Sequence, residues 1–308
     1  MTLFAYHDLF LQHTLSGHPE CAERLISIIS HLQKSPLWQK LNFVSPRYAT
    51  HDELALIHTE EHIRKIQNFC KNGGGWLDLD TYCQPHSFDI ARLAVGITLE
   101  TADQITRGND VNAFCAVRPP GHHATPNQSM GFCLFNNIAI LAKYIQSKDW
   151  GKSILIIDWD VHHGNGTQDA FYNDPSISYF SIHRYPFYPG TGQADEKGAG
   201  LGYGTTMNHP ISIQTHPDTM VEIFCDSLTK FAKQVHPDWL LISCGFDAYA
   251  HDPVGSLGLN FEHYQRLTHH AKQIAHEYCH NRIISILEGG YALEALGKLT
   301  ATHLEVLI

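Results

Sequence analysis

Polar side chains that could bind a metal ion follow directly after short apolar runs. Asp160 and His162 follow the run 153–158 and are two residues apart, so extended backbone points both to the same side. Asp247 follows the run 239–244 and could supply a third ligand. Two carboxylates and one imidazole leave positions for water and substrate, which is the form of a catalytic zinc site. Three such residues at corresponding strand ends favour this site over simple strand-end capping.

Two adjacent histidines could handle the protons of a hydrolysis at such a metal. His122 and His123 lie in a loop framed by Pro and Gly after the apolar run 113–117. Histidine exchanges protons near neutral pH, and its second ring nitrogen needs a partner that fixes the tautomer. We expect Asp158 and Asn165 to be these partners. In a chain with 23 histidines, the pair gains weight from its position opposite the proposed metal ligands.

A tyrosine could complete this chemistry. Tyr291 follows Glu288-Gly289-Gly290, after the apolar run 283–287. Its hydroxyl could donate a hydrogen bond to a developing oxyanion. Without the metal site, a buried tyrosine at a helix start would be the simpler interpretation.

Alternating strand and helix patterns predict how these residues are positioned. Strands are expected at 113–117, 153–158, 239–244 and 283–287, and helices at 19–34, 87–107, 134–146, 218–234 and 261–280. Such alternation predicts an α/β fold with a central parallel sheet and helices on both faces. Ligands bind beyond the carboxyl ends of such strands, where the chemistry-bearing residues lie.

The composition narrows the classes of protein. A chain of 308 residues, 43% of them hydrophobic, can bury a large core, and no linker or low-complexity run divides it, so we expect one catalytic domain over 1–308. Gly73–Gly75 is expected as a loop. The net charge of -10, without a Lys/Arg cluster, argues against direct nucleic-acid binding and favours cationic partners. Without a secretion signal or membrane span, a soluble cytoplasmic protein is expected.

Longer motifs follow one another along nearly the whole chain. They are Gly17-His18-Pro19-Glu20 with Arg24, RPPGHHA (118–124), GFCLFNN (131–137), DWDVHHGNGTQDAF (158–171), SIHRYPFYPGTG (181–192), GFDAYAHDPVGSLGL (245–259) and EGGY (288–291). In this order they resemble the histone deacetylase family. The resemblance implies an arginase-like fold and hydrolysis of the amide of an acylated lysine to a free amine and acetate.

The resemblance also implies roles for individual residues. It places one Zn²⁺ per chain on Asp160, His162 and Asp247. The implied catalytic set is His122, His123, Tyr291, Asp158 and Asn165. In it, His123 acts as general base and then acid, His122 is its electrostatic partner held by an aspartate, and the tyrosine polarises the scissile carbonyl. A monovalent-cation site, expected to hold K⁺, is implied at Asp158, Asp160, His162, Ser181 and Ile182.

A substrate channel is implied by the same resemblance. Phe132 and Tyr188 would line it together with Gly131, Pro19 and Val254. Members often carry phenylalanine where this chain has Tyr188, so the tyrosine changes the polarity of the channel. Val254 stands where polyamine-preferring relatives carry glutamate, which favours acylated lysine in a peptide or protein over an acetylated polyamine. Asn165 makes the chain similar to class II and bacterial deacetylase-like amidohydrolases.

Several alternatives remain open. The segment His58–His62 matches H-x-x-E-H, an inverted zinc-protease pattern, on an expected helix, with Glu61 as base. A relative of the same fold could be a binuclear manganese hydrolase. The chain could also be an amidohydrolase for acetylpolyamines or other small amides, or a non-catalytic acyl-lysine binder. A complete proton-transfer set argues against a binder, since binding alone does not require one.

Overall fold

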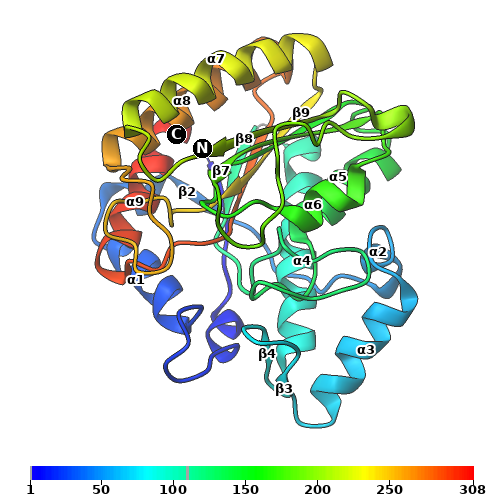
Figure 1. The fold of residues 1–308 in the computed structure, drawn as a ribbon. Helices are drawn as coiled ribbons and strands as arrows, with labels where there is room; N and C mark the ends of the chain where they lie inside the picture. Colours follow the sequence, from blue (N-terminus) through cyan, green and yellow to red (C-terminus); the bar gives the residue numbers. More distant parts are fainter. Residues whose placement is uncertain (1, 109–110) are drawn as a thin grey trace.

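The central feature of the fold is one parallel sheet. The computed structural model describes residues 2–108 and 111–308 (Figure 1). Within them eight strands pair in the order β2-β1-β5-β10-β9-β6-β7-β8. All neighbours in this sheet are parallel. The strands are β1 (Thr2–Ala5), β2 (Leu41–Phe43), β5 (Asn112–Cys115), β6 (Ile154–Asp158), β7 (Ile177–Arg184), β8 (Thr206–Ile211), β9 (Trp239–Cys244) and β10 (Ile283–Leu287). The expected parallel α/β sheet is confirmed.

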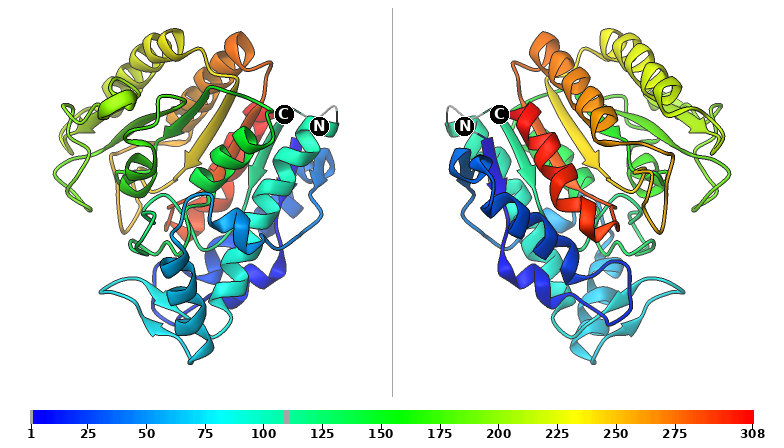
Figure 2. Two further views of the ribbon diagram at one scale, coloured as in Figure 1. Left: turned by 90° about the vertical axis from the view of Figure 1, so that its right-hand side faces the viewer. Right: turned by 90° about the vertical axis from the view of Figure 1, so that its left-hand side faces the viewer.

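Helices cover both faces of this sheet (Figure 2). One layer holds α1, α9, α8 and α7, each packed on the next, and the other holds α4, α5 and α6. The helices are α1 (Ala22–Gln33), α2 (His51–Leu54), α3 (Glu60–Lys71), α4 (Ser87–Arg107), α5 (Asn137–Ser147), α6 (Asn165–Phe171), α7 (Pro217–Val235), α8 (Phe261–Tyr278) and α9 (Leu293–Leu307). Short 3₁₀ turns span Asp8–Gln12, Pro36–Lys40 and Gly200–Gly202. No helix of the described residues is both long and apolar enough to cross a bilayer.

Each predicted strand and helix is present in the structure, and some of them begin or end a few residues away from the predicted position. β9, β10 and α4 begin and end where the sequence predicts, because buried apolar runs and a long helical period leave little choice. α5 begins at Asn137, three residues later than predicted, because the Asn136 side chain caps it by accepting from the backbone N–H of Ala139. The expected loop at Gly73–Gly75 ends in a hairpin, β3 (Gly75–Trp76) with β4 (Tyr82–Cys83). The single-domain expectation stays a prediction.

Strand register brings the chemistry-bearing loops together. Asp158 of β6 pairs with Ser243 of β9, and Cys244 of β9 pairs with Leu287 of β10. Because these neighbouring strands end at almost the same level, the loops that follow them leave the sheet side by side. The residues expected to do chemistry therefore gather at one edge of the sheet.

Candidate active site

The three proposed metal ligands form one buried cluster. Asp160 and His162 lie in the loop after β6, and Asp247 lies in the loop after β9. A ligand atom from each lies within 4.8 Å of the others, and all three side chains are buried. His162 Nδ1 is 3.0 Å from Asp160 Oδ1 and 3.2 Å from Asp247 Oδ2. The sequence prediction that these residues meet is consistent with this placement.

The cluster has the chemistry of a divalent metal site. Asp247 Oδ1 accepts a hydrogen bond from Val161 N at 2.9 Å, whereas the buried Asp247 Oδ2 makes no hydrogen bond of good geometry and has the imidazole of His162 as its neighbour at 3.2 Å. A buried carboxylate oxygen without a well-formed hydrogen bond is costly in free energy. Burial and the adjacent charge of Asp160 raise the pKa of Asp247 to about 7. A divalent cation would satisfy this oxygen and both carboxylate charges, so the residues present fit a zinc ion.

Two glycines leave room for these carboxylates. A Cβ at Gly245 would lie 2.3 Å from Asp160 Oδ2, and one at Gly289 would lie 2.0 Å from Asp247 Oδ2. Gly289 also donates its backbone N–H to Asp160 Oδ2 at 2.8 Å. Any side chain at these positions would occupy the space of the cluster.

The two histidines are held by the partners that we expected. His122 Nδ1 donates to Asp158 Oδ2 at 3.0 Å, and His123 Nδ1 donates to Asn165 Oδ1 at 2.8 Å. The centroids of the two imidazole rings are 4.0 Å apart. Each Nδ1 is therefore occupied by a carboxylate or an amide oxygen, which leaves Nε2 for other contacts.

Electrostatics separates these two histidines. Burial alone would lower the pKa of His122, but the carboxylates of Asp158 and Asp160 outweigh burial and raise the pKa to about 10. Burial, His122 and His162 together lower the pKa of His123 well below its usual value. These opposite pKa shifts favour the charged form of His122 and the neutral form of His123, which can accept a proton.

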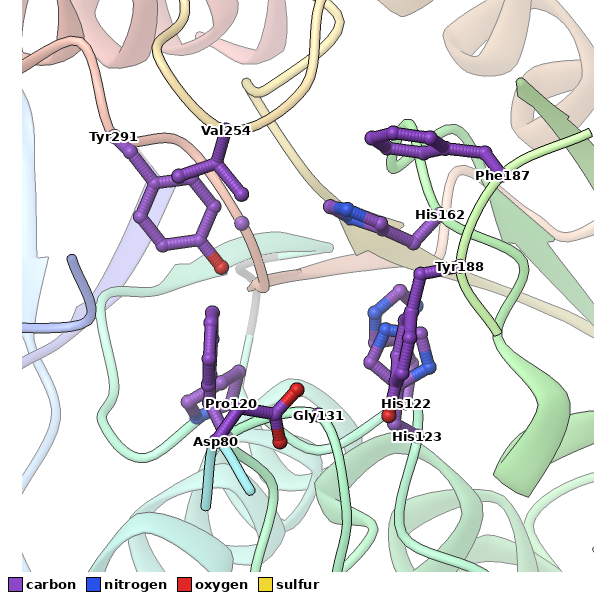
Figure 3. A pocket seen from close by; sticks show the side chains of 12 residues that line it. Asp80, Pro120, His122, His123, Gly131, His162, Phe187, Tyr188, Val254 and Tyr291 are labelled. Carbon is purple, nitrogen blue, oxygen red and sulfur yellow. The ribbon is translucent and has the colours of Figure 1, made fainter. Parts of the chain in front are cut away.

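Tyr291 lies across the cavity from the metal cluster. Figure 3 shows its hydroxyl directed into the space that His162 faces from the other side. Its backbone N–H donates to Asp252 Oδ2 at 2.7 Å, and the Arg24 guanidinium lies 4.8 Å from its ring centroid. The ring is therefore fixed from behind while the hydroxyl is free to reach a ligand.

A cavity of about 220 Å³ connects these groups to the surface. Its lining comprises Asp80, Pro120, His122, His123, Gly131, Phe132, His162, Phe187, Tyr188, Val254, Gly289 and Tyr291. Four of the five predicted channel residues are among them. Pro19 is not, and lines a neighbouring groove beside Tyr291 and Leu293.

Several residues that sequence reasoning missed contribute to this site. Phe187 stacks on the His162 ring at 5.1 Å, and Asp80 reaches the cavity from the β3–β4 turn. Glu288 Oε2 accepts from Gly121 N at 2.7 Å and from His122 N at 3.1 Å, so it holds the histidine loop. The EGGY motif contained the signal for Glu288, whereas no periodic pattern marks Asp80.

Three residues of the predicted cation site lie on two neighbouring strands, Asp158 on β6 and Ser181 and Ile182 on β7, whereas Asp160 and His162 lie in the loop after β6. Asp158 pairs in register with Ser181, and Ser181 Oγ is 2.8 Å from His183 Nδ1. Ile182 is buried next to them. None of these contacts tests K⁺ binding, which stays a prediction.

The H-x-x-E-H segment has a structural role. α3 begins at Glu60, so His58 lies outside the helix on which it was expected. His58 Nε2 accepts from Asn136 N at 2.8 Å, and His62 Nε2 donates to Leu134 O at 3.1 Å. Both imidazoles thereby hold the segment before α5.

Comparisons with known proteins find deacetylases and histone deacetylase domains. The family described as "Histone deacetylase domain" matches residues 18–307. A "Probable deacetylase" of Archaeoglobus fulgidus is 35% identical over 310 residues, which cover 100% of this chain and 85% of that protein. "Histone deacetylase 10, chloroplastic" of Oryza sativa is also 35% identical, covering 94% of this chain and 69% of its own length. A crystal structure of the HDA15 HD domain superposes with a TM-score of 0.92 at 34% identity, covering 99% of this chain and 89% of that one.

Proposed function

This chain belongs to the histone deacetylase family and has its arginase-like fold, and we propose that it is a zinc-dependent deacylase. The proposed reaction is hydrolysis of the amide of an acylated lysine to a free amine and acetate or another short acid. The observation that carries the proposal is the buried cluster of Asp160, His162 and Asp247, which lies at the cavity that His122 and His123 also line.

A bound zinc ion would act on the substrate carbonyl and on a water molecule. A Zn²⁺ held by Asp160, His162 and Asp247 would polarise the carbonyl and lower the pKa of a water molecule beside it. Within residues 2–108 and 111–308, only these three residues gather as a group of candidate ligands. This supports one ion per chain and disfavours a binuclear manganese site.

The chain's own residues move the protons. His123 is neutral, and Asn165 occupies its Nδ1, so its Nε2 is the atom that accepts a proton from the attacking water. The same nitrogen then returns the proton to the leaving amine. His122, charged and held by Asp158, stabilises the negative charge that develops on the substrate. Tyr291 keeps its proton and donates a hydrogen bond from its hydroxyl to the carbonyl oxygen.

The cavity walls favour a straight aliphatic stem. Phe132 and Tyr188 line it with their rings, and Val254 adds an apolar side chain beside Tyr291 (Figure 3). An extended lysine side chain presents methylene groups to such walls. The absence of a carboxylate at position 254 supports lysine over polyamine, whereas Asp80 at the same cavity keeps acetylpolyamine as the second candidate.

The binding partners and the cellular location of the protein are proposals or predictions. We propose an acylated lysine in a peptide or protein as the substrate and expect no direct nucleic-acid binding, in line with the net charge of -10. The expected cytoplasmic location stays a prediction, and one relative from rice is named chloroplastic.

The test is hydrolysis of a panel of acyl-lysine peptides and acetylpolyamines by the purified protein, with zinc added, chelated and restored. We expect release of the acid to stop on chelation and to resume with zinc. If folded, metal-loaded protein turned over no member of the panel, the deacylase proposal would be wrong, and a non-catalytic binder would be favoured.

A matched pair of tyrosine variants tests the oxyanion role. We expect Tyr291→Phe to lower kcat by about 10²–10³-fold with little change in KM, because the hydroxyl acts on the developing charge. Tyr264→Phe is the control, because the Tyr264 hydroxyl is buried without a hydrogen-bond partner. Equal activity of the two variants would remove Tyr291 from the reaction.

A further inference from the structure

The β3–β4 hairpin presents apolar side chains to solvent beside the cavity. Leu79, at the tip of its turn, is 102% exposed, and Trp76 is 53% exposed. On the same turn Asp80 lines the cavity, and Tyr188, also on the lining, is 37% exposed. Two exposed apolar side chains, Trp76 and Leu79, therefore lie on the hairpin that also carries Asp80 of the cavity lining.

The turn that carries Leu79 is held rigidly. Asp78 Oδ1 accepts from the backbone N–H groups of Asp80 at 3.0 Å and Thr81 at 2.7 Å. Leu77 N donates to Thr81 O at 2.8 Å and closes the turn. The position of Leu79 is thus fixed by hydrogen bonds on both sides, and its exposure is a feature of the folded turn.

The same turn is attached directly to the cavity wall. Phe132 N donates to Thr81 Oγ1 at 3.1 Å, and His18 Nε2 donates to Asp80 O at 3.0 Å. The His18 ring packs on Phe132 at 4.7 Å and on Trp76 at 5.9 Å. Whatever binds at the hairpin tip is consequently held in a fixed relation to the channel.

The negative charge of this surface favours a ligand that carries a positive charge. Residues 76–80 carry two carboxylates, Asp78 and Asp80, and no cationic side chain. Both lie close enough to the Tyr188 hydroxyl to contribute, after burial, to raising its pKa. A surface with apolar side chains and carboxylates complements a chain that offers an apolar side chain and a cation together.

We propose that Trp76, Leu79 and Asp78 form a docking surface for the polypeptide that carries the acylated lysine. The occupant is an extended protein segment with an apolar residue next to the acyl-lysine and a lysine or arginine near it. A free acetylpolyamine offers the cation but no apolar side chain, so the hairpin distinguishes a protein substrate from a polyamine. This inference rests on the proposed deacylase function and names its substrate class.

The experiment compares four substrates on the zinc-loaded full chain. Two acetyl-lysine peptides carry a lysine two residues away and differ only in flanking the acetyl-lysine with leucine or with glycine. The other two are a capped single acetyl-lysine and an acetylspermidine. We expect kcat/KM to be about five- to tenfold higher for the leucine peptide than for the glycine peptide, because only leucine buries apolar surface on the hairpin.

Variants assign this preference to the hairpin. Leu79→Ser should raise KM for the leucine peptide about fivefold and leave the single acetyl-lysine unchanged, since only the peptide reaches Leu79. Asp78→Asn should weaken both peptides about two- to threefold at low salt, with a smaller effect at high salt. Leu201→Ser is the matched control, because Leu201 is 83% exposed and does not line the cavity. It should leave all four substrates unchanged.

The possible failures can be distinguished. Equal turnover of the two peptides by the wild type, or an equal loss on all substrates in Leu79→Ser, would overturn the docking surface while leaving the deacylase intact. Turnover of acetylspermidine well above every peptide would overturn it in favour of a polyamine substrate. If the zinc-loaded wild type turned over none of the four, the proposed function would fail and this inference with it.

Discussion

Two groups of buried acidic side chains differ in how their charge is satisfied. In the first, Glu20 accepts hydrogen bonds from Arg24 Nη1 at 3.0 Å and from Arg118 Nη2 at 2.7 Å, and Arg118 Nε donates to it as well. Remaining guanidinium N–H groups bind backbone oxygens, among them those of Phe10 and Gly290. Burial alone would raise the pKa of Glu20, but the arginines outweigh it and lower the pKa to about 2.

The second group is the cluster of Asp160, His162 and Asp247. Its two carboxylates share the imidazole of His162, the cluster contains no arginine or lysine, and one carboxylate oxygen makes no hydrogen bond of good geometry. The first group is closed by the protein itself, whereas the second is open to a ligand of opposite charge. Two equally buried carboxylates can therefore have different roles. A carboxylate paired with arginines stabilises the fold, whereas one without such partners can bind a ligand.

The largest expected effect comes from removing one charge of the open group. Asp247→Asn should lower turnover at least about 10³-fold and abolish zinc retention, because a neutral amide is a poor ligand for a divalent ion. The metal-free variant should still fold, because burial and the charge of Asp160 already disfavour the ionised form of the carboxyl that it replaces. Zinc content per chain, turnover and urea denaturation check these points. One zinc per chain with wild-type turnover would contradict the assignment.

Removing the charge of the closed group should act on stability instead. Glu20→Gln leaves two buried guanidinium groups without a counter-charge, and we expect a loss of about 3–5 kcal/mol in the free energy of unfolding. The control is Glu100→Gln, which removes a partly exposed partner 3.6 Å from Arg47 Nε and should cost about 0–1 kcal/mol. Urea denaturation measures both. Similar losses in the two variants would show that the closed group is not special.

Acid should weaken the closed group in a defined pH window. The folded-state pKa of Glu20, about 2, lies below its ordinary value of 4.5, so the folded state favours the ionised carboxylate. The resulting stability is fully present above pH 4.5 and is lost as the pH falls towards 2. By linkage it is worth about 3 kcal/mol. Over this window the difference in unfolding free energy between wild type and Glu20→Gln should shrink, and a constant difference would contradict the prediction.

The smallest expected effects compare two similar hydrogen bonds. Tyr179 donates to Asp158 Oδ2 at 3.0 Å, the same oxygen that His122 contacts, and Tyr144 donates to Asp103 Oδ1 at 3.0 Å in a different part of the fold. Both Tyr→Phe variants should lose about 1 kcal/mol of stability. Only Tyr179→Phe should also lower kcat, about tenfold with KM unchanged, because it loosens the carboxylate that orients His122. Equal kcat in the two variants would leave Tyr179 with a structural role only.

The sequence predicted the elements that are long and strongly patterned. β9 and β10 are apolar apart from one serine each, and the polar residues after them could be placed at one edge of a parallel sheet from that pattern. The pairing of Asp158 with His122, and of Asn165 with His123, followed from the needs of an imidazole. The family resemblance supplied most of the channel.

The remaining features depend on contacts that local sequence does not encode. β3 and β4 have two residues each, too few for a periodic signal, so Asp80 was not expected at the cavity. Glu288 acts on backbone N–H groups 166 and 167 positions away in the chain. Pro19 belongs to a correctly recognised motif, but the path of the chain before α1 places it in the neighbouring groove.

The glycines beside the metal cluster have a consequence for genetics. Gly245 and Gly289 keep space open where a single added methyl group would overlap a ligand oxygen. We expect a change to alanine or valine at either position to lower activity as strongly as loss of a proposed metal ligand, although it alters no charge. When sequence variants of this protein are interpreted, a missense change at these two small residues should therefore be grouped with changes of the proposed ligands.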